Sequence, residues 1–445
     1  MATTTRRLSA ILVAALLTLP VAAAASPRPR GPVYGTDVHE AGTRNFPDPA
    51  LLRADGRWFA YATGSTGGTN LTVISSDELW DWQPPAEALP EPPNWARSQS
   101  EGGAFWAPSV IAAAGRYVLY FAARHRAVPA GRPGWCIGAA TSTVPGGPFT
   151  PVQRPVVCRV TGLGQVSGTS AAPARGQGMI DPFVYRSPGG GLYLLAKAND
   201  RPWQLTAMAL SADGLTVRGA AHGLLQLAAG ARTWEYSRGG GFTVLENPAI
   251  DYDTSTGGYQ LFYSGSDWAS ADYATGLAEC RSPLGPCTRT TTRGPWLRSA
   301  RGVVGPGGLS VTVAGRQRWV AYHSWARGKV GGGNGRRLHV EPLTYAHGVP
   351  KLQQRAPRGR FHAASDLPGT VTFTGAARDP DTGQPTLVTV REEGTVVARG
   401  RAVDGRFEFS VQDVELRTHR YCATFHDDHR GANAFPPCEV VNLGL

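Results

Sequence analysis

Short apolar stretches and glycine-rich turns alternate along most of the chain. Stretches such as RYVLYFAA and GYQLFYSG are rich in aromatic and β-branched residues, which favour strands. No long stretch shows the three- to four-residue spacing of apolar positions that marks an amphipathic helix. The pattern therefore predicts an all-β protein.

One arrangement of these stretches recurs five times. Each copy has a short motif ending in proline, an apolar strand, a glycine-centred turn and an aromatic-rich strand, and the prolines are Pro49, Pro108, Pro182, Pro248 and Pro306. The copies are 58 to 74 residues apart, which is the spacing of a unit repeated once per blade. We therefore expect a five-bladed β-propeller over residues 34–351.

The residue before each proline should occupy an equivalent place near the mouth of the central channel. The five residues are Asp48, Ala107, Asp181, Asn247 and Gly305. Because Ala107 and Gly305 carry no acid, the fold itself does not require one there. The copy with Asn247 has an acid one position earlier, Glu246. Three carboxylates from three blades are thus expected to converge on one cavity.

A single Asp-Pro pair usually does no more than start a turn. Three acids at one repeat position favour a catalytic cluster instead. Like charges crowded in a confined site shift each other's pKa values and favour unequal protonation, which acid–base chemistry requires.

Residues after about 352 lack the repeated motif. They read as alternating strands and hairpin turns, which is typical of a small antiparallel sandwich. We expect a flexible leader over 26–33, a linker over 352–361 around an arginine cluster, and an immunoglobulin-like β-sandwich over 362–445.

Residues 1–25 have the pattern of a cleaved secretory signal. Arg6 and Arg7 precede an apolar run that ends in small residues and is too short for a membrane span. We therefore expect an exported protein that is not inserted in a membrane.

The six cysteines fit an oxidising compartment. They fall into three pairs that are close in sequence, and local disulfides are the simplest interpretation, although spacing does not fix connectivity; the pairs are Cys136 with Cys158, Cys280 with Cys287 and Cys422 with Cys438. The alternative for Cys280 and Cys287 is two free thiols under a loop. No CxxC pair or histidine cluster indicates a metal, and no cofactor is expected.

The net charge of +11 comes mostly from scattered arginines. Only three of the 44 basic residues are lysines: Lys197, Lys329 and Lys351. Without a basic run, the charge argues against a nucleic-acid partner, although it is compatible with a salt-dependent attraction to acidic polymers. The sequence gives no indication of oligomeric state.

Several motifs point to one family. FPDP with Asp48, IDPF with Asp181 and ENPAI with Glu246 occur in order, together with Trp-Ala-Pro, Gly-Pro-Gly, AYHSW and a closing RRLHVEPLTYAHGVPKL. This set resembles glycoside hydrolase family 43, five-bladed propellers that act on arabinose- and xylose-containing glycans, over roughly residues 34 to 351. Invertase-like propellers fit less well, because Ile180 stands before the second acid and Asn247 after the third.

The resemblance implies a role for each acid. Asp48 would be the general base that activates water, Glu246 the general acid that protonates the leaving oxygen, and Asp181 the residue that keeps Glu246 protonated and oriented. An inverting mechanism needs its acid and base about 6.5 to 9.5 Å apart. Carboxylates on opposite sides of a channel can supply that separation.

Two departures from the family pattern leave other functions open. Gly308 stands where the family often has a histidine near a central metal or water, and Ser109 stands where it often has an aspartate. His323 lies mid-strand among apolar neighbours, so we expect a core histidine with its hydrogen bonds satisfied rather than a ligand.

Aromatic side chains are expected to bind the sugar. The candidates are Trp106, at the channel end of blade two, and three residues in loops, Trp203, Trp268 and Tyr273. Each could instead pack between blades. Arg337 matches a basic position that the family uses near the sugar, with a structural salt bridge as the alternative.

The sequence therefore favours a secreted, inverting α-L-arabinofuranosidase or arabinanase acting on a polysaccharide or oligosaccharide. The alternatives are a β-xylosidase on the same fold, a carbohydrate-binding propeller without turnover, and a scaffold protein.

Overall fold

The protein is described by a computed structural model. It covers residues 45–443 except for 65–67, 78, 80–81, 129–133, 162–164, 168–177, 200–202, 229, 301–302, 327, 332–333, 353–356, 379–385, 404 and 427–435. The expected signal and leader (1–33) lie outside these residues. Within the described residues, no helix is long and apolar enough to cross a membrane.

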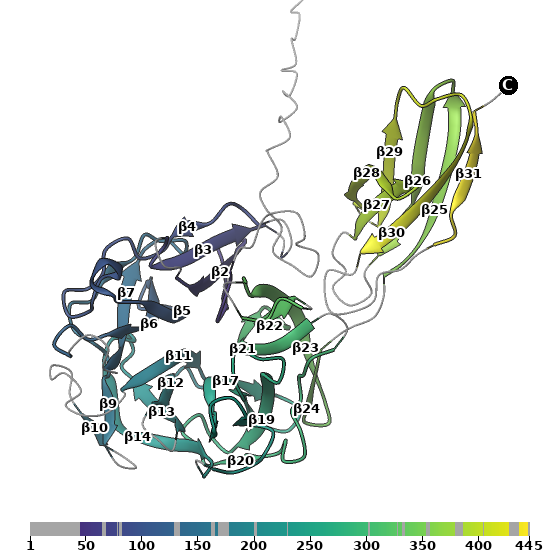
Figure 1. Ribbon diagram of the computed structural model, residues 1–445. Coiled ribbons are helices and arrows are strands. Elements are labelled where there is room, and N and C mark those ends of the chain that lie inside the picture. Colours follow the sequence, from purple (N-terminus) through teal and green to yellow (C-terminus); the bar gives the residue numbers. More distant parts are fainter. Residues whose placement is uncertain are drawn as a thin grey trace, which may run out of the picture. The chain divides into compact units, whose positions relative to one another are not determined.

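Five four-stranded antiparallel sheets form a ring, and each is built from four consecutive strands (Figure 1). Blade 1 contains β1 (Ala50–Ala54), β2 (Arg57–Thr63), β3 (Leu71–Ser76) and β4 (Ala86–Glu87). Blade 2 contains β5 (Phe105–Ala113), β6 (Arg116–Arg124), β7 (Trp135–Ser142) and β8 (Thr150–Pro151). Blade 3 contains β11 (Met179–Arg186), β12 (Leu192–Ala198), β13 (Gln204–Leu210) and β14 (Val217–Gln226).

Blade 4 contains β17 (Glu246–Asp253), β18 (Gly258–Gly265), β19 (Ala274–Cys280) and β20 (Cys287–Arg289). Blade 5 contains β21 (Val303–Ala314), β22 (Gln317–Ala326), β23 (Arg337–Ala346) and β24 (Val349–Leu352). The first strands of neighbouring blades contact one another. The expected five-bladed propeller is thereby confirmed.

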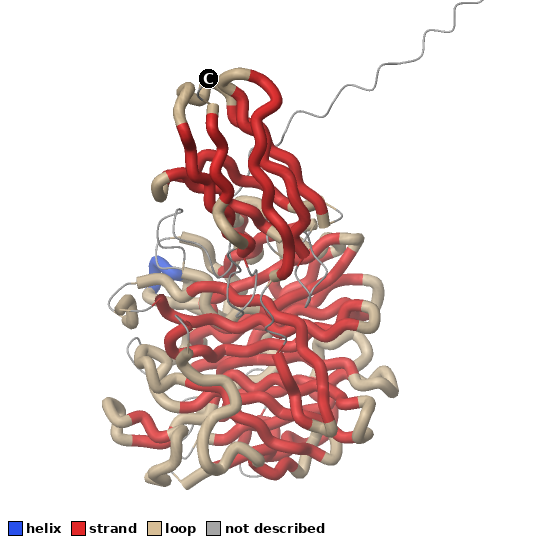
Figure 2. Tube along the Cα trace, turned by 90° about the vertical axis from the view of Figure 1, so that its right-hand side faces the viewer, coloured by secondary structure: helices blue, strands red, loops and turns tan. Residues whose placement is uncertain are grey.

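Short elements complete this part of the chain. Two small hairpins lie between blades, β9 (Arg159–Thr161) with β10 (Gln165–Ser167) and β15 (Tyr236–Ser237) with β16 (Phe242–Thr243). Apart from these, the described residues contain one 3₁₀ turn, η1 (Gln99–Glu101), so strands and loops dominate the trace (Figure 2).

The repeated proline motif forms a backbone bulge. The residue before each proline has φ between +47° and +59°, in the same set of five that the sequence placed in register: Asp48, Ala107, Asp181, Asn247 and Gly305. The strand register shifts at this point in blades 2 to 5. A bulge re-aims a side chain away from the strand's regular alternation. Because Ala107 adopts the same conformation, the bulge belongs to the fold and the acids are additions to it.

The ring closes between blade 1 and blade 5 without exchanging a strand. The Ser310 hydroxyl donates to the Pro49 carbonyl and the Thr312 hydroxyl to the Leu51 carbonyl, each at 2.7 Å. A buried apolar cluster that includes Trp58 and Trp319 fills the space between the two sheets. Side-chain contacts therefore hold the ends of the ring together.

The C-terminal strands form two antiparallel sheets. One contains β25 (Arg358–Leu367), β26 (Thr370–Arg378) and β29 (Arg406–Val411). The other contains β28 (Thr395–Arg401), β27 (Leu387–Glu392), β30 (Thr418–His426) and β31 (Glu439–Asn442). Phe373, Val388 and Phe425 belong to their shared buried core, as expected of a β-sandwich.

The first sandwich strand begins earlier than the sequence suggested. β25 starts at Arg358, inside the segment assigned as a linker over 352–361. Arg360 is exposed and Phe361 is buried, so Arg360 lies on the outward face of a strand.

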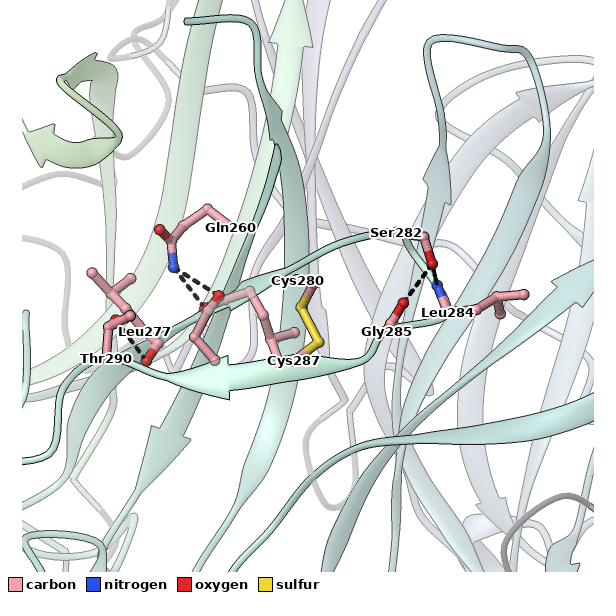
Figure 3. Close-up of a disulfide and its surroundings, with 10 residues drawn as sticks. Gln260, Leu277, Cys280, Ser282, Leu284, Gly285, Cys287 and Thr290 are labelled. Atoms are coloured by element: carbon pink, nitrogen blue, oxygen red, sulfur yellow. Dashed lines mark hydrogen bonds between the residues drawn. A yellow bond between two sulfur atoms is a disulfide. The ribbon is translucent and has the colours of Figure 1, made fainter. Parts of the chain in front are cut away.

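All three expected cysteine pairs are disulfides: Cys136–Cys158, Cys280–Cys287 and Cys422–Cys438. Figure 3 shows Cys280 and Cys287 joining β19 to β20 in blade 4. The free-thiol alternative for this pair is wrong.

Candidate active site

The three acids from the repeated motif line one cavity of about 490 Å³. Asp48 lies just before β1, Asp181 lies in β11 and Glu246 opens β17. They come from three blades, and each acid belongs to the repeated proline motif of its blade. The convergence expected from the repeat register is therefore present, although the three carboxyls have different neighbours.

Asp48 is surrounded by groups from blades 1 and 5. Its carboxylate accepts a hydrogen bond from the Thr63 hydroxyl at 2.7 Å, and one oxygen lies 3.7 Å from the Arg336 guanidinium. Its backbone N–H donates to Nδ1 of His323 at 3.0 Å. Asp48 therefore has a positive charge as a neighbour on the side of blade 5.

Asp181 is the most deeply enclosed of the three acids. Its Oδ2 accepts the backbone N–H of Asn247 at 3.1 Å. Burial raises the pKa of Asp181 to about 8, and the nearby charge of Glu246 adds to the effect while Lys197 opposes it. This carboxyl therefore holds a proton at neutral pH.

Glu246 is held from two sides. The Lys197 ammonium lies 2.9 Å from Oε2, and the Tyr273 hydroxyl donates to Oε1 at 2.8 Å. The amide of Asn247 donates in turn to the Tyr273 oxygen at 3.1 Å. These contacts fix the orientation of the carboxyl group within the cavity.

Comparison with known proteins agrees with this geometry. The family model described as "Glycosyl hydrolases family 43" matches residues 42–350. The chain belongs to glycosyl hydrolase family 43. It is therefore a glycoside hydrolase, and family 43 enzymes act on polysaccharides or oligosaccharides.

Solved structures show the same fold. A thermostable family 43 glycoside hydrolase is 25% identical, with a TM-score of 0.58 over 72% of this chain and 96% of that one. An endo-1,4-β-xylanase from Bacteroides thetaiotaomicron is 20% identical, with a TM-score of 0.53 over 70% and 95%. An α-L-arabinofuranosidase from Lactobacillus brevis is 20% identical, with a TM-score of 0.52 over 68% and 93%. No curated protein matches the chain.

All four aromatic residues suggested by the sequence line the family 43 cavity. Trp106 stacks on Trp135 with ring centroids 3.9 Å apart, and Trp203 meets Phe242 edge to face. Trp268 is 48% exposed, whereas Tyr273 is fully buried beneath the acids. The exposed Trp268 ring is therefore available for contact with a sugar. The buried Tyr273 is instead placed to hold Glu246.

Arg336 lines the cavity, as Lys197 does, whereas Arg337 lies outside the lining. The Arg336 guanidinium lies 4.8 Å from the ring centroid of Trp268 and near Asp48. Arg337 is the first residue of β23 and pairs with Ser324. Neighbouring residues of an extended chain point to opposite sides, so an error of one position moves a side chain out of the site.

His323 is buried, as expected, but only half of its hydrogen bonding is satisfied. Nδ1 accepts the N–H of Asp48, whereas Nε2 has no partner within the described part of the chain. Burial, followed by the charge of Arg336, holds the pKa of His323 well below its usual range, so the ring is neutral. The neutral ring therefore holds the backbone of Asp48 by a hydrogen bond and places no second positive charge beside its carboxylate.

The two departures from the family pattern have structural explanations. A Cβ at Gly308 would lie 2.6 Å from the His323 ring and 3.0 Å from an Asp48 oxygen, so His323 occupies the space that a side chain at 308 would need. The Ser109 hydroxyl accepts the Val184 N–H at 3.0 Å and joins blade 2 to blade 3. Within the described ranges, no three His, Cys, Asp or Glu side chains are grouped to hold a metal.

Sequence reasoning missed Lys197, which lies in β12 and is 2% exposed. A signal was present, because it is one of three lysines in the chain and interrupts the apolar stretch LYLLAKA. A charge inside a buried strand requires a partner, and Glu246 is that partner.

Proposed function

We propose that the chain is an exported, inverting glycosidase acting on arabinose-containing glycans, as an α-L-arabinofuranosidase or arabinanase. In this proposal Asp48 is the general base, Glu246 the general acid and Asp181 the group that modulates Glu246. The supporting observation is the convergence of three carboxyls on one cavity with three different sets of neighbours.

Each environment suits its proposed role. A general base must present an ionised carboxylate, and Asp48 faces the positive charge of Arg336. Asp181 remains protonated at neutral pH, which limits the negative charge beside the acid. Glu246 is held in place by Lys197 and Tyr273, as an acid that must reach one leaving oxygen should be.

The sugar is proposed from the family and from enzymes that share the fold. These include the arabinofuranosidase and the xylanase named above, and an arabinanase from Cellvibrio cellulosa. The xylanase keeps a β-xylosidase as the second candidate. Export is supported by three disulfides in the chain and by the secretory pattern of residues 1–25.

Hydrolysis of nitrophenyl α-L-arabinofuranoside and β-xyloside by the wild type and by Glu246→Gln tests this function. We expect the wild type to release pentose and the variant to lose about 10²- to 10⁴-fold in rate, as typical of a lost general acid. The product anomer, followed by NMR, tests inversion separately. Equal rates in the two proteins would remove Glu246 from its role, and a faster xyloside rate would favour the xylosidase.

A further inference from the structure

Lys197 is a buried cation between two blades. It extends from β12 of blade 3, where its backbone pairs with Ile180 beside Asp181, and its ammonium reaches Glu246 in blade 4 at 2.9 Å. The same ammonium lies 3.5 Å from the ring centroid of Trp203. An ammonium removed from water needs such partners, and an aromatic face is a favourable one.

This placement restricts the position of Glu246. Lys197 contacts Oε2 while Tyr273 contacts Oε1, so the carboxyl plane is fixed by one group from each side. The Trp203 ring, which also lines the cavity, lies against the same ammonium. Without the ammonium, only one of the two oxygens of Glu246 would keep a protein donor among these contacts.

The lysine also places a positive charge beside the acids of the cavity. Glu246 and Asp181 both line it, and Asp181 accepts a hydrogen bond from the backbone N–H of Asn247, the residue after Glu246. The other titratable or charged groups that line the cavity around this pair are Asp48, Asp267, Tyr273 and Arg336. A cation beside an acid makes the loss of its proton easier.

We propose that Lys197 is a positioning residue: it fixes Glu246 for proton donation, and its charge lowers the pH at which the acids beside it give up their protons. This inference rests on the proposed function of Glu246 as the general acid, and it adds a residue that holds this acid in place.

Three variants test it. Lys197→Met keeps the length of the side chain and removes its charge, Lys197→Arg keeps the charge, and Lys351→Met removes a charge from an exposed strand position as the matched control. Each is assayed for kcat and KM against pH with the nitrophenyl glycoside that the wild type cleaves, after its thermal unfolding has shown that it folds.

We expect kcat of Lys197→Met to fall about 10- to 100-fold, with KM changed much less, because a carboxyl displaced by about 1 Å costs that much. The alkaline limb of its pH profile should move up by about one pH unit, because loss of the nearby positive charge makes the acid pair harder to deprotonate. Lys197→Arg should keep the limb where the wild type has it. Lys351→Met should match the wild type in every respect.

A titration that does not depend on activity separates this inference from the proposed function. In protein with ¹³C-labelled aspartate carboxyls, the Asp181 signal is assigned by its absence from Asp181→Asn and followed against pH. A midpoint raised in Lys197→Met and restored in Lys197→Arg supports the lysine's role even if neither glycoside is hydrolysed, in which case only the proposed function fails. An unchanged midpoint and an unchanged alkaline limb in Lys197→Met would overturn the inference. If Lys197→Met does not fold, Lys197→Arg decides: a midpoint that departs from the wild type overturns it, and a retained midpoint supports it.

Discussion

At the scale of single residues, neighbours decide what each carboxyl can do. Asp48 faces a guanidinium, whereas Asp181 is enclosed and faces another acid. The two residues have the same side chain and the same position in the repeated motif. The different surroundings of the two carboxyls therefore come from the neighbouring blades.

The raised pKa of Asp181 predicts a loss of stability as the pH rises. Its ordinary pKa is 3.8 and burial raises it to about 8, so between these values the folded chain keeps a proton that the unfolded chain has released. Stability should fall across this range by at most about 1.4 kcal/mol per pH unit. Urea unfolding at pH 5, 7 and 8.5 should show that Asp181→Asn lacks this pH dependence of the unfolding free energy. Asp77→Asn, a change at an exposed position, should retain it. Equal slopes in wild type and Asp181→Asn would contradict the burial argument.

Gly308 is expected to be irreplaceable because of the contact it allows. Gly308 and Gly315 both have φ +61°, but a Cβ at Gly315 would meet nothing within 4 Å. Gly315→Ala should cost only the left-handed strain of about 1–2 kcal/mol and leave hydrolysis intact. Gly308→Ala should cost more and also lower activity, because it pushes His323 against Asp48. Thermal unfolding and rate assays on both variants check this, and similar losses in the two would argue against it.

The sequence revealed the acids more readily than their partners. Asp48, Asp181 and Glu246 share a repeat position, so the register alone placed them together. Lys197 and Arg336 share no such position, since each reaches the cavity through packing between blades. Contacts of that kind depend on the three-dimensional arrangement and leave only weak marks in sequence.

At the scale of elements, a disulfide supports one wall of the cavity. Trp106 stacks on Trp135, and the next residue, Cys136, is bonded to Cys158. The backbone N–H of Ile137 also donates to Val157, so both sides of this crosslink are ordered. The wall that carries Trp106 therefore depends on β7 and on the segment that the disulfide ties to it.

Removing this disulfide should affect both stability and activity. Its cysteines are 22 residues apart, so loop closure predicts a loss of about 3 kcal/mol for Cys136→Ala with Cys158→Ala, and the shifted Trp106 should raise KM. The matched control is Cys280→Ala with Cys287→Ala, 7 residues apart, which should cost about 2 kcal/mol and leave KM unchanged. Denaturant unfolding and kinetics measure both. A KM that changes equally in the two double variants would show that Trp106 does not depend on the first disulfide.

The segments that form strands could be predicted because the motif repeats. The first and last residues of the strands were predicted less well. Each proline follows a residue with positive φ at the start of a blade, and five copies leave little ambiguity. The start of β25 was misplaced because a stretch with Arg358 and Arg360 around a glycine has the composition of a linker. At this point the composition indicates a linker, whereas the alternation of polar and apolar positions indicates a strand. The buried Phe361 agrees with the strand.

At the scale of the whole molecule, the sandwich has the parts of an independent folding unit. Its two sheets, its buried core and the Cys422–Cys438 disulfide all lie after β24. We expect a fragment of residues 353–445 to unfold in one cooperative transition by circular dichroism, and a chain ending at residue 356 to keep hydrolytic activity. A fragment without a transition would show that the sandwich needs the rest of the chain.

The way the ring closes has a consequence for when the enzyme becomes active. Asp48 belongs to the first blade, but His323 and Arg336, which steady it, belong to the last. A chain still emerging from the ribosome acquires its three acids well before it acquires these two partners. The surroundings of Asp48 are therefore incomplete until blade 5 has folded. A partly synthesised copy of this hydrolase should be inactive for that reason.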